Sequence, residues 1–444
     1  MPSLLRAAAA LSALALAAFV PVVTAGPASA TDDPLWSKQW APVKIGAPAA
    51  WNATTGTGIK IGIVDSGVDL NHQDLQGKIV ANASCIGTNG NAAGCVSGGG
   101  QDIAGHGTHV AGVAAATKDN RVGIAGIAPG AQLVVARVFQ NDSADLADVE
   151  AGIRWVVDQG AKIVNLSLGE NVLLGGLLGG GQASLGPALN DAWARGAIPV
   201  VAAGNAQFLS GAASYANVNA VVVGATGPDD EIASYSVSTG SAKWALVAPG
   251  GNGAEAREIV STYWQPGTSN QYGYLQGTSM AAPHVSGALA LLLARGVGQQ
   301  RAVELVLSTA NRAVTCGNAC VGRLDVAAAM AAAGPVAVPA SSPPPTAAPA
   351  TAPPTARPRV NTTRPPTTTA PTTTTGAPPP ETTVAPAPPP PVTDPTVAGE
   401  PLQVAAATTD AEEDDVVLPG IAAGLLLLLA AAGNVVVRRR VGSG

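Results

Sequence analysis

A serine, a histidine and an aspartate stand in three short segments whose residue types suit nucleophilic catalysis. Ser279 lies in Gly-Thr-Ser-Met-Ala-Ala-Pro, His106 in Gly-His-Gly-Thr-His and Asp65 in Ile-Val-Asp-Ser-Gly. A serine hydroxyl is inert at neutral pH unless a base removes its proton. The segments therefore predict Ser279 as nucleophile, His106 as base and then acid, and Asp65 as the group that orients His106. The chain order Asp, His, Ser is one of the known triad orders.

Several polar residues near these segments have simpler interpretations. Ser279 could cap the apolar helix that it opens, although capping and catalysis do not exclude each other. We interpret His109, His72 and His284 as structural histidines, because a single histidine near an active-site helix is more often packed than catalytic. Asp69 is expected to be a surface residue in the turn after Asp65.

Asn205 follows an apolar run and an Ala-Ala-Gly segment. A side-chain amide placed beside a nucleophile can donate to the oxyanion that forms during acyl transfer. We therefore predict Asn205 as an oxyanion donor, together with the backbone N–H of Ser279. A buried structural asparagine is the alternative.

Together these segments resemble the subtilisin-like (S8) serine proteases, and the N-terminal part resembles their thermitase-like branch. Asp33-Pro34, Gln39-Trp40 and residues 47–51 match that branch's mature N-terminus. The resemblance covers residues 33–333 and implies a serine endopeptidase that cleaves protein or peptide substrates through an acyl-enzyme. It also makes the first histidine of the motif, His106, the base.

The resemblance implies further site residues. Ser167, Leu168 and Gly169 resemble the strand that pairs with substrate backbone, which gives affinity without side-chain selectivity. Few charged residues lie near the predicted pocket, so we expect broad specificity with an apolar or aromatic P1 residue. A structural Ca²⁺ site is also implied, and oxygen ligands suit this ion. Its side-chain and carbonyl ligands would be Asp33, Asp74, Thr117, Asn120, Val122 and Ile124.

Short apolar runs alternate with helical patterns through the middle of the chain. Near-continuous hydrophobicity is typical of parallel strands covered on both faces. The sequence thus predicts an α/β fold, a three-layer subtilisin-like fold with a mostly parallel central sheet and helices on both faces. Asp65 and Asn205 should lie at one rim, beyond the carboxyl ends of strands. The expected strands are residues 59–64, 133–138, 162–166, 198–203 and 220–223, and the expected helices are residues 110–116, 145–159, 188–195 and 279–293.

Residues 1–30 have the pattern of a secretory signal peptide, with an apolar run and an Ala-Ser-Ala cleavage site. A retained membrane helix is the alternative, but the run is short for that. The peptidase domain should then span residues 31–334. Only a short segment separates the predicted cleavage site from Asp65, so we expect no inhibitory propeptide domain.

The C-terminal part indicates a membrane anchor. The uncharged residues 416–437 are long enough to cross a bilayer. Basic residues stay on the cytoplasmic side, so the peptidase domain should be extracytoplasmic on a single-pass protein of the cell membrane. The expected segments are a Pro/Thr/Ala-rich disordered linker at residues 335–410, an acidic segment at 411–415, the membrane helix at 416–437 and a basic tail at 438–444.

This architecture is similar to that of the mycosins, the subtilases of actinobacterial type VII secretion. It therefore leaves a second function open, a scaffold in a secretion complex in which proteolysis is secondary. All four expected catalytic positions are filled, which favours an active enzyme. The formal net charge of −6 gives no reason to propose nucleic acid as a partner.

Four cysteines lie in the part of the chain predicted to be exported, and four cysteines allow three pairings. We expect Cys85–Cys95 and Cys316–Cys320, because each closes a short loop. The Cys-x-x-x-Cys spacing of the second pair could suggest a metal, but no histidine or third cysteine lies near it. Disulfides fit an oxidising compartment.

Overall fold

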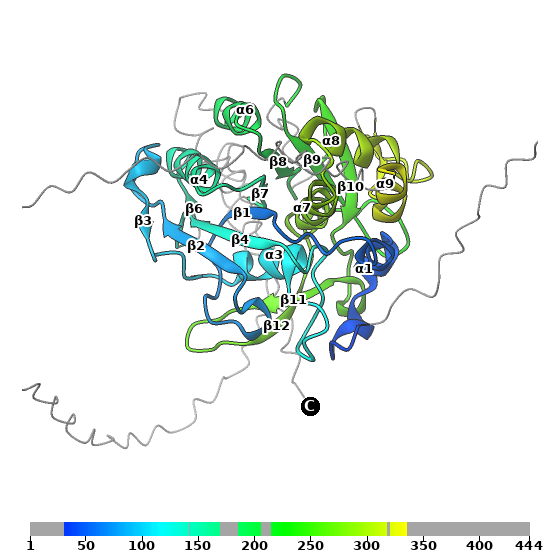
Figure 1. Cartoon of the computed structure of the whole chain (residues 1–444), viewed down its shortest axis with the longest axis horizontal. Coiled ribbons are helices and arrows are strands. Elements are labelled where there is room, and N and C mark those ends of the chain that lie inside the picture. The colour runs from blue at the N-terminus through cyan, green and yellow to red at the C-terminus, as the bar shows by residue number, and fades with distance from the viewer. Residues whose placement is uncertain (1–30, 142, 169–184, 206–214, 318–319, 335–444) are drawn as a thin grey trace, which may run out of the picture. The chain divides into compact units, whose positions relative to one another are not determined.

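The computed structural model describes residues 31–141, 143–168, 185–205, 215–317 and 320–334 (Figure 1). The predicted signal peptide, linker, acidic segment, membrane helix and basic tail lie outside these ranges. Within them, no helix combines the length and the apolar character needed to cross a membrane.

A nine-stranded sheet forms the centre of the described part, in the order β13-β10-β9-β8-β7-β1-β4-β2-β3. Its neighbours pair in parallel except β3, which lies antiparallel to β2 at one edge. The mostly parallel sheet predicted from the sequence is thus confirmed. The strands are β1 (Lys60–Asp65), β2 (Ile79–Ser84), β3 (Val96–Ser97), β4 (Gln132–Arg137), β7 (Ile163–Leu166), β8 (Ile198–Ala202), β9 (Val221–Thr226), β10 (Trp244–Pro249) and β13 (Cys320–Arg323).

Two antiparallel hairpins lie outside the main sheet. One joins β5 (Phe139–Gln140) to β6 (Ser143–Ala144), and the other joins β11 (Ile259–Tyr263) to β12 (Gln271–Leu275). The second hairpin leads directly into the segment that carries Ser279.

Helices cover both faces of the sheet. In Figure 1, α4 and α6 lie above the strands and α3 lies below them. The helices are α1 (Trp40–Lys44), α2 (Ala47–Trp51), α3 (His106–Ala115), α4 (Leu146–Asp158), α6 (Gly186–Ala194), α7 (Thr278–Ala294), α8 (Gln299–Ser308) and α9 (Val326–Ala332). Short 3-10 turns are η1 (Trp36–Lys38), η2 (Gln73–Leu75), η3 (Ala92–Gly94) and η4 (Glu255–Arg257).

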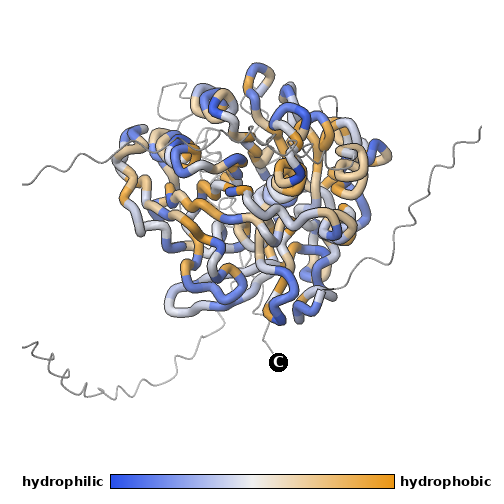
Figure 2. Tube along the Cα trace, in the orientation of Figure 1, coloured by the Kyte–Doolittle hydropathy of each residue, from blue (hydrophilic) through white to orange (hydrophobic). Residues whose placement is uncertain are grey.

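Side chains of β1 enter two hydrophobic cores, one on each face of the sheet. Ile61 and Ile63 belong to the core that contains α3 and α7, whereas Val64 belongs to the core that contains α4. Gly62 allows α4 to approach, since a Cβ there would lie 2.7 Å from the side chain of Val156. Figure 2 shows the apolar strands in the interior and hydrophilic segments around them. Burial of both sheet faces explains the near-continuous apolar runs of the sequence.

The expected strands and helices are confirmed with small shifts at their ends, apart from the start of α3. We expected this helix to begin at residue 110, but α3 begins at His106. Gly105 adopts the left-handed conformation (φ +83°) immediately before it. A residue with no Cβ reaches this conformation without strain, so the helix can begin at His106.

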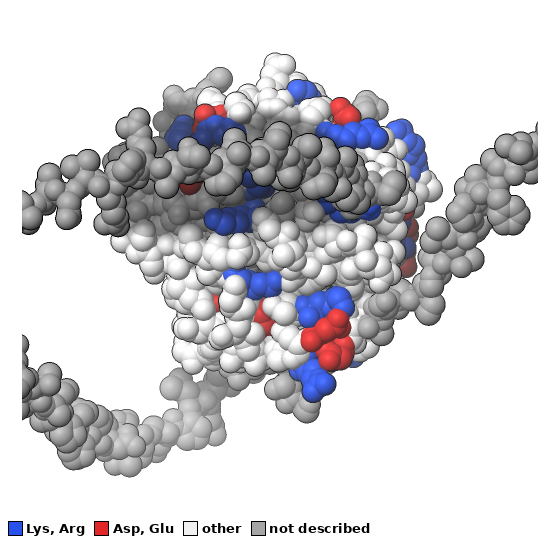
Figure 3. Space-filling view, in the orientation of Figure 1, with Lys and Arg blue, Asp and Glu red and all other residues white. Residues whose placement is uncertain are grey.

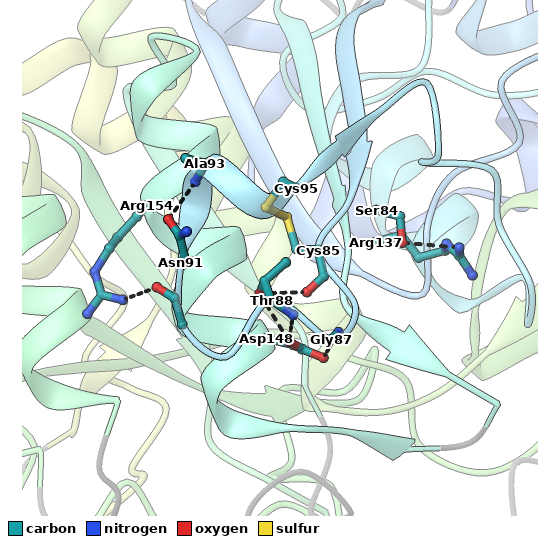
Figure 4. Close-up of a disulfide and its surroundings, with 11 residues drawn as sticks. Ser84, Cys85, Gly87, Thr88, Asn91, Ala93, Cys95, Arg137, Asp148 and Arg154 are labelled. Atoms are coloured by element: carbon teal, nitrogen blue, oxygen red, sulfur yellow. Dashed lines mark hydrogen bonds between the residues drawn. A yellow bond between two sulfur atoms is a disulfide. The ribbon is translucent and has the colours of Figure 1, made fainter.

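Both expected disulfides are present, Cys85–Cys95 and Cys316–Cys320. Figure 4 shows how the loop closed by the first is attached to α4. The carboxylate of Asp148 accepts the backbone N–H groups of Gly87 and Thr88, both at 2.8 Å. Nearby, the guanidinium of Arg154 donates to a carbonyl of the same loop. The loop is therefore held covalently and by hydrogen bonds to a helix of the core.

Charged side chains are sparse on the face shown in Figure 3. Where grey atoms do not cover it, most of this face is uncharged, and the charged residues form small separate groups, one of them of mixed sign at the lower right. Ion pairs such as Lys44–Asp230 and Arg257–Asp229 combine opposite charges at the surface.

Candidate active site

Asp65 is the last residue of β1, a central strand between β4 and β7. Its side chain is 0% exposed. One carboxylate oxygen, Oδ1, accepts from His106 Nδ1 at 2.8 Å and from the backbone N–H of Ser66 at 2.7 Å. The structure therefore brings Asp65 and His106 together as predicted.

His106 opens α3 and approaches Asp65 because the next residue is glycine. A Cβ at Gly107 would lie 2.0 Å from the carbonyl oxygen of Gly67 and 3.0 Å from the Cβ of Asp65. Burial lowers the pKa of His106, but the charge of Asp65, their hydrogen bond and the charge of Asp102 together raise this pKa above its ordinary value. The protonated form of His106 is thus stabilised, as a group that accepts a proton during catalysis requires.

Asp102 is a buried carboxylate that the sequence analysis missed. It accepts from the backbone N–H groups of Gly105 and Thr108, both at 2.9 Å, and from the hydroxyl of Ser66 at 2.8 Å. Ser66 Oγ in turn accepts the N–H of Gly107 at 3.0 Å. Asp102 therefore joins the start of the His106 helix to the loop after Asp65. Its position four residues before His106 was the only available signal.

Ser279 lies in the first turn of α7 and is buried, at 4% exposure. Its hydroxyl donates to the carbonyl oxygen of Ser167 at 3.1 Å and not to His106. Hydrogen bonds of a catalytic site often form only when substrate is bound. A rotation about the Cα–Cβ bond of Ser279 must therefore redirect the hydroxyl before His106 can remove its proton.

Asn205 follows β8, and its side chain is oriented by Thr278. The amide oxygen accepts both the backbone N–H and the hydroxyl of Thr278, at 2.9 Å each. The amide nitrogen is then the group that can donate. A Cβ at Gly277 would lie 3.3 Å from this nitrogen, so a glycine there lets the amide of Asn205 approach the start of α7. The arrangement suits a donor adjacent to Ser279.

The predicted substrate strand follows β7. Ser167 is fully buried and Leu168 is 8% exposed. The hydroxyl of Ser167 donates to the carbonyl oxygen of Ser279 at 2.7 Å, so this side chain binds the backbone of the segment that carries the proposed nucleophile. Gly169 lies outside the described residues.

The other three histidines have the structural contacts expected of packed residues. His109 Nε2 bonds to the carbonyl of Ile259 at 2.9 Å, and burial lowers its pKa to about 3. His284 bonds to the carbonyl of Met280, and burial lowers its pKa to about 4. His72 bonds to a carbonyl of β12.

The prediction for Asp69 was wrong. Asp69 is 2% exposed, and its carboxylate accepts from the hydroxyl of Ser269 at 2.7 Å and from the N–H of Asn71 at 3.0 Å. The long turn between β11 and β12 folds over this residue and removes it from solvent. That contact joins segments 200 residues apart, so local sequence gave no sign of it.

Asp33, Asp74 and Asn120 lie together, as the resemblance implied. Asp33 accepts the backbone N–H of Asn120 at 3.2 Å, and Asp74 accepts the side-chain amide of Asn120 at 2.9 Å. Burial raises the pKa of Asp74 to about 7, and the charge of Asp33 adds to the effect. Both carboxylates are nearly inaccessible, at 4% and 0% exposure.

The segment after α3 encloses these two carboxylates. The segment between Thr117 and Ile124 wraps around Asp74, since the N–H groups of both end residues donate to it. The N–H of Val122 is bound by Asn120, within the same loop. Among the described residues, no group of three or more His, Cys, Asp or Glu side chains could hold a metal. A cation here would thus need neutral oxygens beside the two carboxylates, which is the ligand type that Ca²⁺ accepts.

Comparison with known proteins agrees with this geometry. A profile of the subtilase family (Peptidase S8) matches residues 56–318. The chain is 38% identical to thermitase from Thermoactinomyces vulgaris over 283 residues, covering 63% of this chain and 91% of thermitase. It is 38% identical to subtilisin BL from Lederbergia lenta, covering 58% of this chain and 84% of that protein.

A solved structure of a protease from Pseudoalteromonas arctica PAMC 21717 is similar to the chain, with a TM-score of 0.59 and 28% identity. The match covers 69% of this chain and 100% of that one. The family match spans the segments that carry Asp65, His106, Asn205 and Ser279. The chain therefore belongs to the subtilase family of serine endopeptidases.

Proposed function

We propose that Asp65, His106 and Ser279 form the catalytic triad of this serine endopeptidase. The observation that carries the proposal is the 2.8 Å hydrogen bond between His106 Nδ1 and the fully buried carboxylate of Asp65. It leaves Nε2 of His106 as the ring nitrogen that can act as a base. No other described histidine pairs with a carboxylate.

In this mechanism the hydroxyl of Ser279 attacks the scissile carbonyl while Nε2 of His106 accepts its proton. Asp65 stabilises the imidazolium that results and keeps the ring oriented. His106 then donates the proton to the leaving amine, which leaves an acyl group on Ser279. A water molecule attacks the acyl-enzyme by the same steps in reverse, and the triad returns to its starting state.

The negative oxygen of each tetrahedral intermediate would be stabilised by Asn205 Nδ2 and the backbone N–H of Ser279. The support is that Thr278 binds the amide oxygen of Asn205 and so directs the amide nitrogen to the donor role. Donors that are already oriented stabilise the transition state without reorganisation during the reaction.

Substrates would be extended protein or peptide segments that pair by their backbones with the strand at Ser167. Selectivity would then depend on an apolar P1 pocket, with a broad choice of sequences. The support is the apolar character of this segment and the resemblance to subtilases.

A structural Ca²⁺ ion would be held by the carboxylates of Asp33 and Asp74, the side-chain oxygen of Asn120 and the carbonyls of Thr117, Val122 and Ile124. The support is the pair of buried carboxylates and the raised pKa of Asp74. The ion would tie the N-terminal segment to the loop after α3 and take no part in the chemistry.

We propose that the enzyme acts outside the cytoplasm, attached to the membrane through residues 416–437 after removal of residues 1–30. The support is the pattern of apolar and charged residues at the two ends of the chain. The disulfides Cys85–Cys95 and Cys316–Cys320 agree with an oxidising compartment. The alternative of a mycosin-like scaffold in a secretion complex stays a prediction.

The triad is tested by labelling the purified full-length chain with a fluorophosphonate probe. Such probes react with activated serines, so we expect labelling of the wild type and none of Ser279→Ala. Ser308→Ala, a substitution of the same kind on α8 and outside the hydrogen bonds that reach Ser279, is the control and should still be labelled. A folded wild type that remains unlabelled with calcium present would contradict the triad.

A further inference from the structure

The carbonyl group of Ser279 has lost its usual partner within α7. In an α-helix this oxygen accepts the N–H of the residue four positions later. That residue is Pro283, which lies inside α7 and has no N–H. A buried carbonyl without a donor costs free energy, so a replacement donor is required.

Ser167 supplies that donor from the end of β7. Its hydroxyl donates to the Ser279 carbonyl at 2.7 Å. The carbonyl of Ser167 accepts the Ser279 hydroxyl at 3.1 Å. One residue thus holds both the main chain and the side chain of the proposed nucleophile.

Asn165 fixes the direction in which the Ser167 hydroxyl points. The amide nitrogen of Asn165 donates to Ser167 Oγ at 2.9 Å. Because Ser167 Oγ already accepts from Asn165, its own proton is left for the carbonyl of Ser279. The direction of this hydrogen bond therefore depends on Asn165 acting as a donor.

Ser286 fixes the orientation of Asn165 in turn. Its hydroxyl donates to the amide oxygen of Asn165 at 2.8 Å, so the amide nitrogen must face Ser167. Ser286 lies two helical turns after Ser279 on α7, and all members of the chain are buried. The hydrogen bonds leave α7 at Ser286, cross β7 and return to α7 at Ser279.

We propose that Asn165 is a positioning residue for Ser279, acting through Ser167 and oriented by Ser286. The proposal rests on Ser279 being the nucleophile, as proposed above. By fixing the carbonyl of Ser279, the chain of hydrogen bonds fixes the backbone that sets the direction of the Ser279 side chain. Small displacements of a reacting group lower the rate of the chemical step strongly.

The decisive substitution is Asn165→Asp, which keeps the size of the side chain and removes its donor. A carboxylate would accept protons from both Ser167 and Ser286, and the carbonyl of Ser279 would lose its hydrogen bond. We expect the plateau value of kcat, per active site titrated with a fluorophosphonate, to fall about 10- to 100-fold. KM should stay within about twofold, because substrate binding is not altered.

The matched control is Asn190→Asp on α6. Asn190 also donates and accepts one hydrogen bond, to Asn217 and from Asn219, away from the site. It should leave kcat unchanged. Equal values of plateau kcat for Asn165→Asp and the wild type would overturn the proposal, as would a loss confined to the acid side of the pH profile.

If Asn165→Asp does not fold, Ser286→Ala tests the positioning role of Asn165 instead. It removes only the hydroxyl that orients Asn165, and we expect kcat per titrated site to fall about threefold. An unchanged kcat would overturn the proposal. Labelling of the wild type by the fluorophosphonate probe shows whether Ser279 is an activated nucleophile. If the wild type is labelled and kcat is unchanged in the variants, only the positioning role of Asn165 is contradicted. If the wild type is not labelled, the proposed triad is contradicted as well.

Discussion

Two buried regions that contain acidic side chains differ in how their charge is balanced. Asp65 faces His106, a side chain of the same chain that can become a cation. Asp33 and Asp74 instead receive hydrogen bonds from backbone N–H groups, one side-chain amide and the hydroxyl of Tyr272, all of them neutral. Burial of a charge is costly unless it is paired, so Asp65 is balanced by a side chain of the same chain, whereas Asp33 and Asp74 would be balanced by the Ca²⁺ ion proposed above.

The pKa directions express the same difference. The charge of Asp65 raises the pKa of His106 despite the opposing effect of burial. Burial and Asp33 raise the pKa of Asp74 to about 7. Burial lowers the pKa of nearby Lys78 to about 8, and the charge of Asp74 opposes this shift. These directions fit proton transfer in the first region and agree with the cation that we propose for the second.

Asp65→Asn should give the largest effect on activity and little on stability. The substitution removes the charge that stabilises the His106 imidazolium and changes the hydrogen bond that sets the ring tautomer, so kcat should fall about 10⁴-fold. The melting temperature should not fall, since a buried charge is removed. Peptide hydrolysis and thermal unfolding of the same preparation check both parts.

Asp74→Asn is the matched comparison for Asp65→Asn. It should leave kcat per titrated site unchanged in calcium but lower the melting temperature. If Asp65→Asn and Asp74→Asn both lower kcat, or both lower the melting temperature, the two regions do not have separate roles in catalysis and stability.

Asn205→Ala tests the oxyanion donor. Loss of one donor of this kind lowers kcat about 10²- to 10³-fold, a magnitude established for the corresponding asparagine of subtilisin, a member of the same family. KM should change little, because the interaction forms mainly in the transition state. Steady-state kinetics on one peptide ester and one peptide amide would measure it. A rise in KM at constant kcat would instead assign Asn205 to substrate binding.

Asp102→Asn sharpens the comparison within the catalytic region. The charge of Asp102 contributes to the raised pKa of His106. Its removal should lower that pKa, so His106 is neutral, and therefore active as a base, down to lower pH. We expect the acid side of the kcat/KM profile to move to lower pH, with a loss of about tenfold at the plateau from weaker positioning.

A profile between about pH 5 and 9 measures both effects of Asp102→Asn. Thr226→Val, a buried substitution away from His106, should leave the profile in place. An acid side that stays fixed or moves to higher pH would show that the charge of Asp102 does not act on His106.

Much of this site could be predicted because its signals are local. The Gly-His-Gly and Gly-Thr-Ser segments are short, and the strand that ends at Asp65 is a continuous apolar run buried on both faces. The fold class and both disulfides followed from such patterns. The start of α3 did not follow from them, because the glycines around His106 are weak helix formers. In the structure Gly105 adopts the left-handed conformation, and the helix begins directly after it.

The residues that were missed or wrongly placed act through contacts distant in sequence. Asp69 is buried by the hairpin turn at Ser269, and Asn165 meets Ser286 across 121 positions. Asp102 is four residues from His106, but its role depends on Ser66, which belongs to another segment. A polar residue with partners of this kind has no pattern in the sequence that distinguishes it from a surface residue.

Removal of calcium should give the smallest effect on chemistry and a clear one on stability. A ligand that binds only the folded state at about 100 times its Kd raises the melting temperature of a domain of this size by roughly 5 to 10 °C. Chelation should lower the melting temperature by this amount, measured by calorimetry on the Ser279→Ala variant to prevent autolysis. Asp229→Asn, at an exposed ion pair, should respond as the parent does.

The effect of calcium should also grow with pH. In the metal-free protein the pKa of Asp74 is about 7 when folded and near 3.8 when unfolded. Between these values the folded state binds more protons than the unfolded state, so its stability falls as pH rises. Bound calcium keeps the carboxylates ionised without that cost. The difference in melting temperature with and without calcium should therefore be larger at pH 8 than at pH 5, and a constant difference would mean that Asp74 is not part of the site.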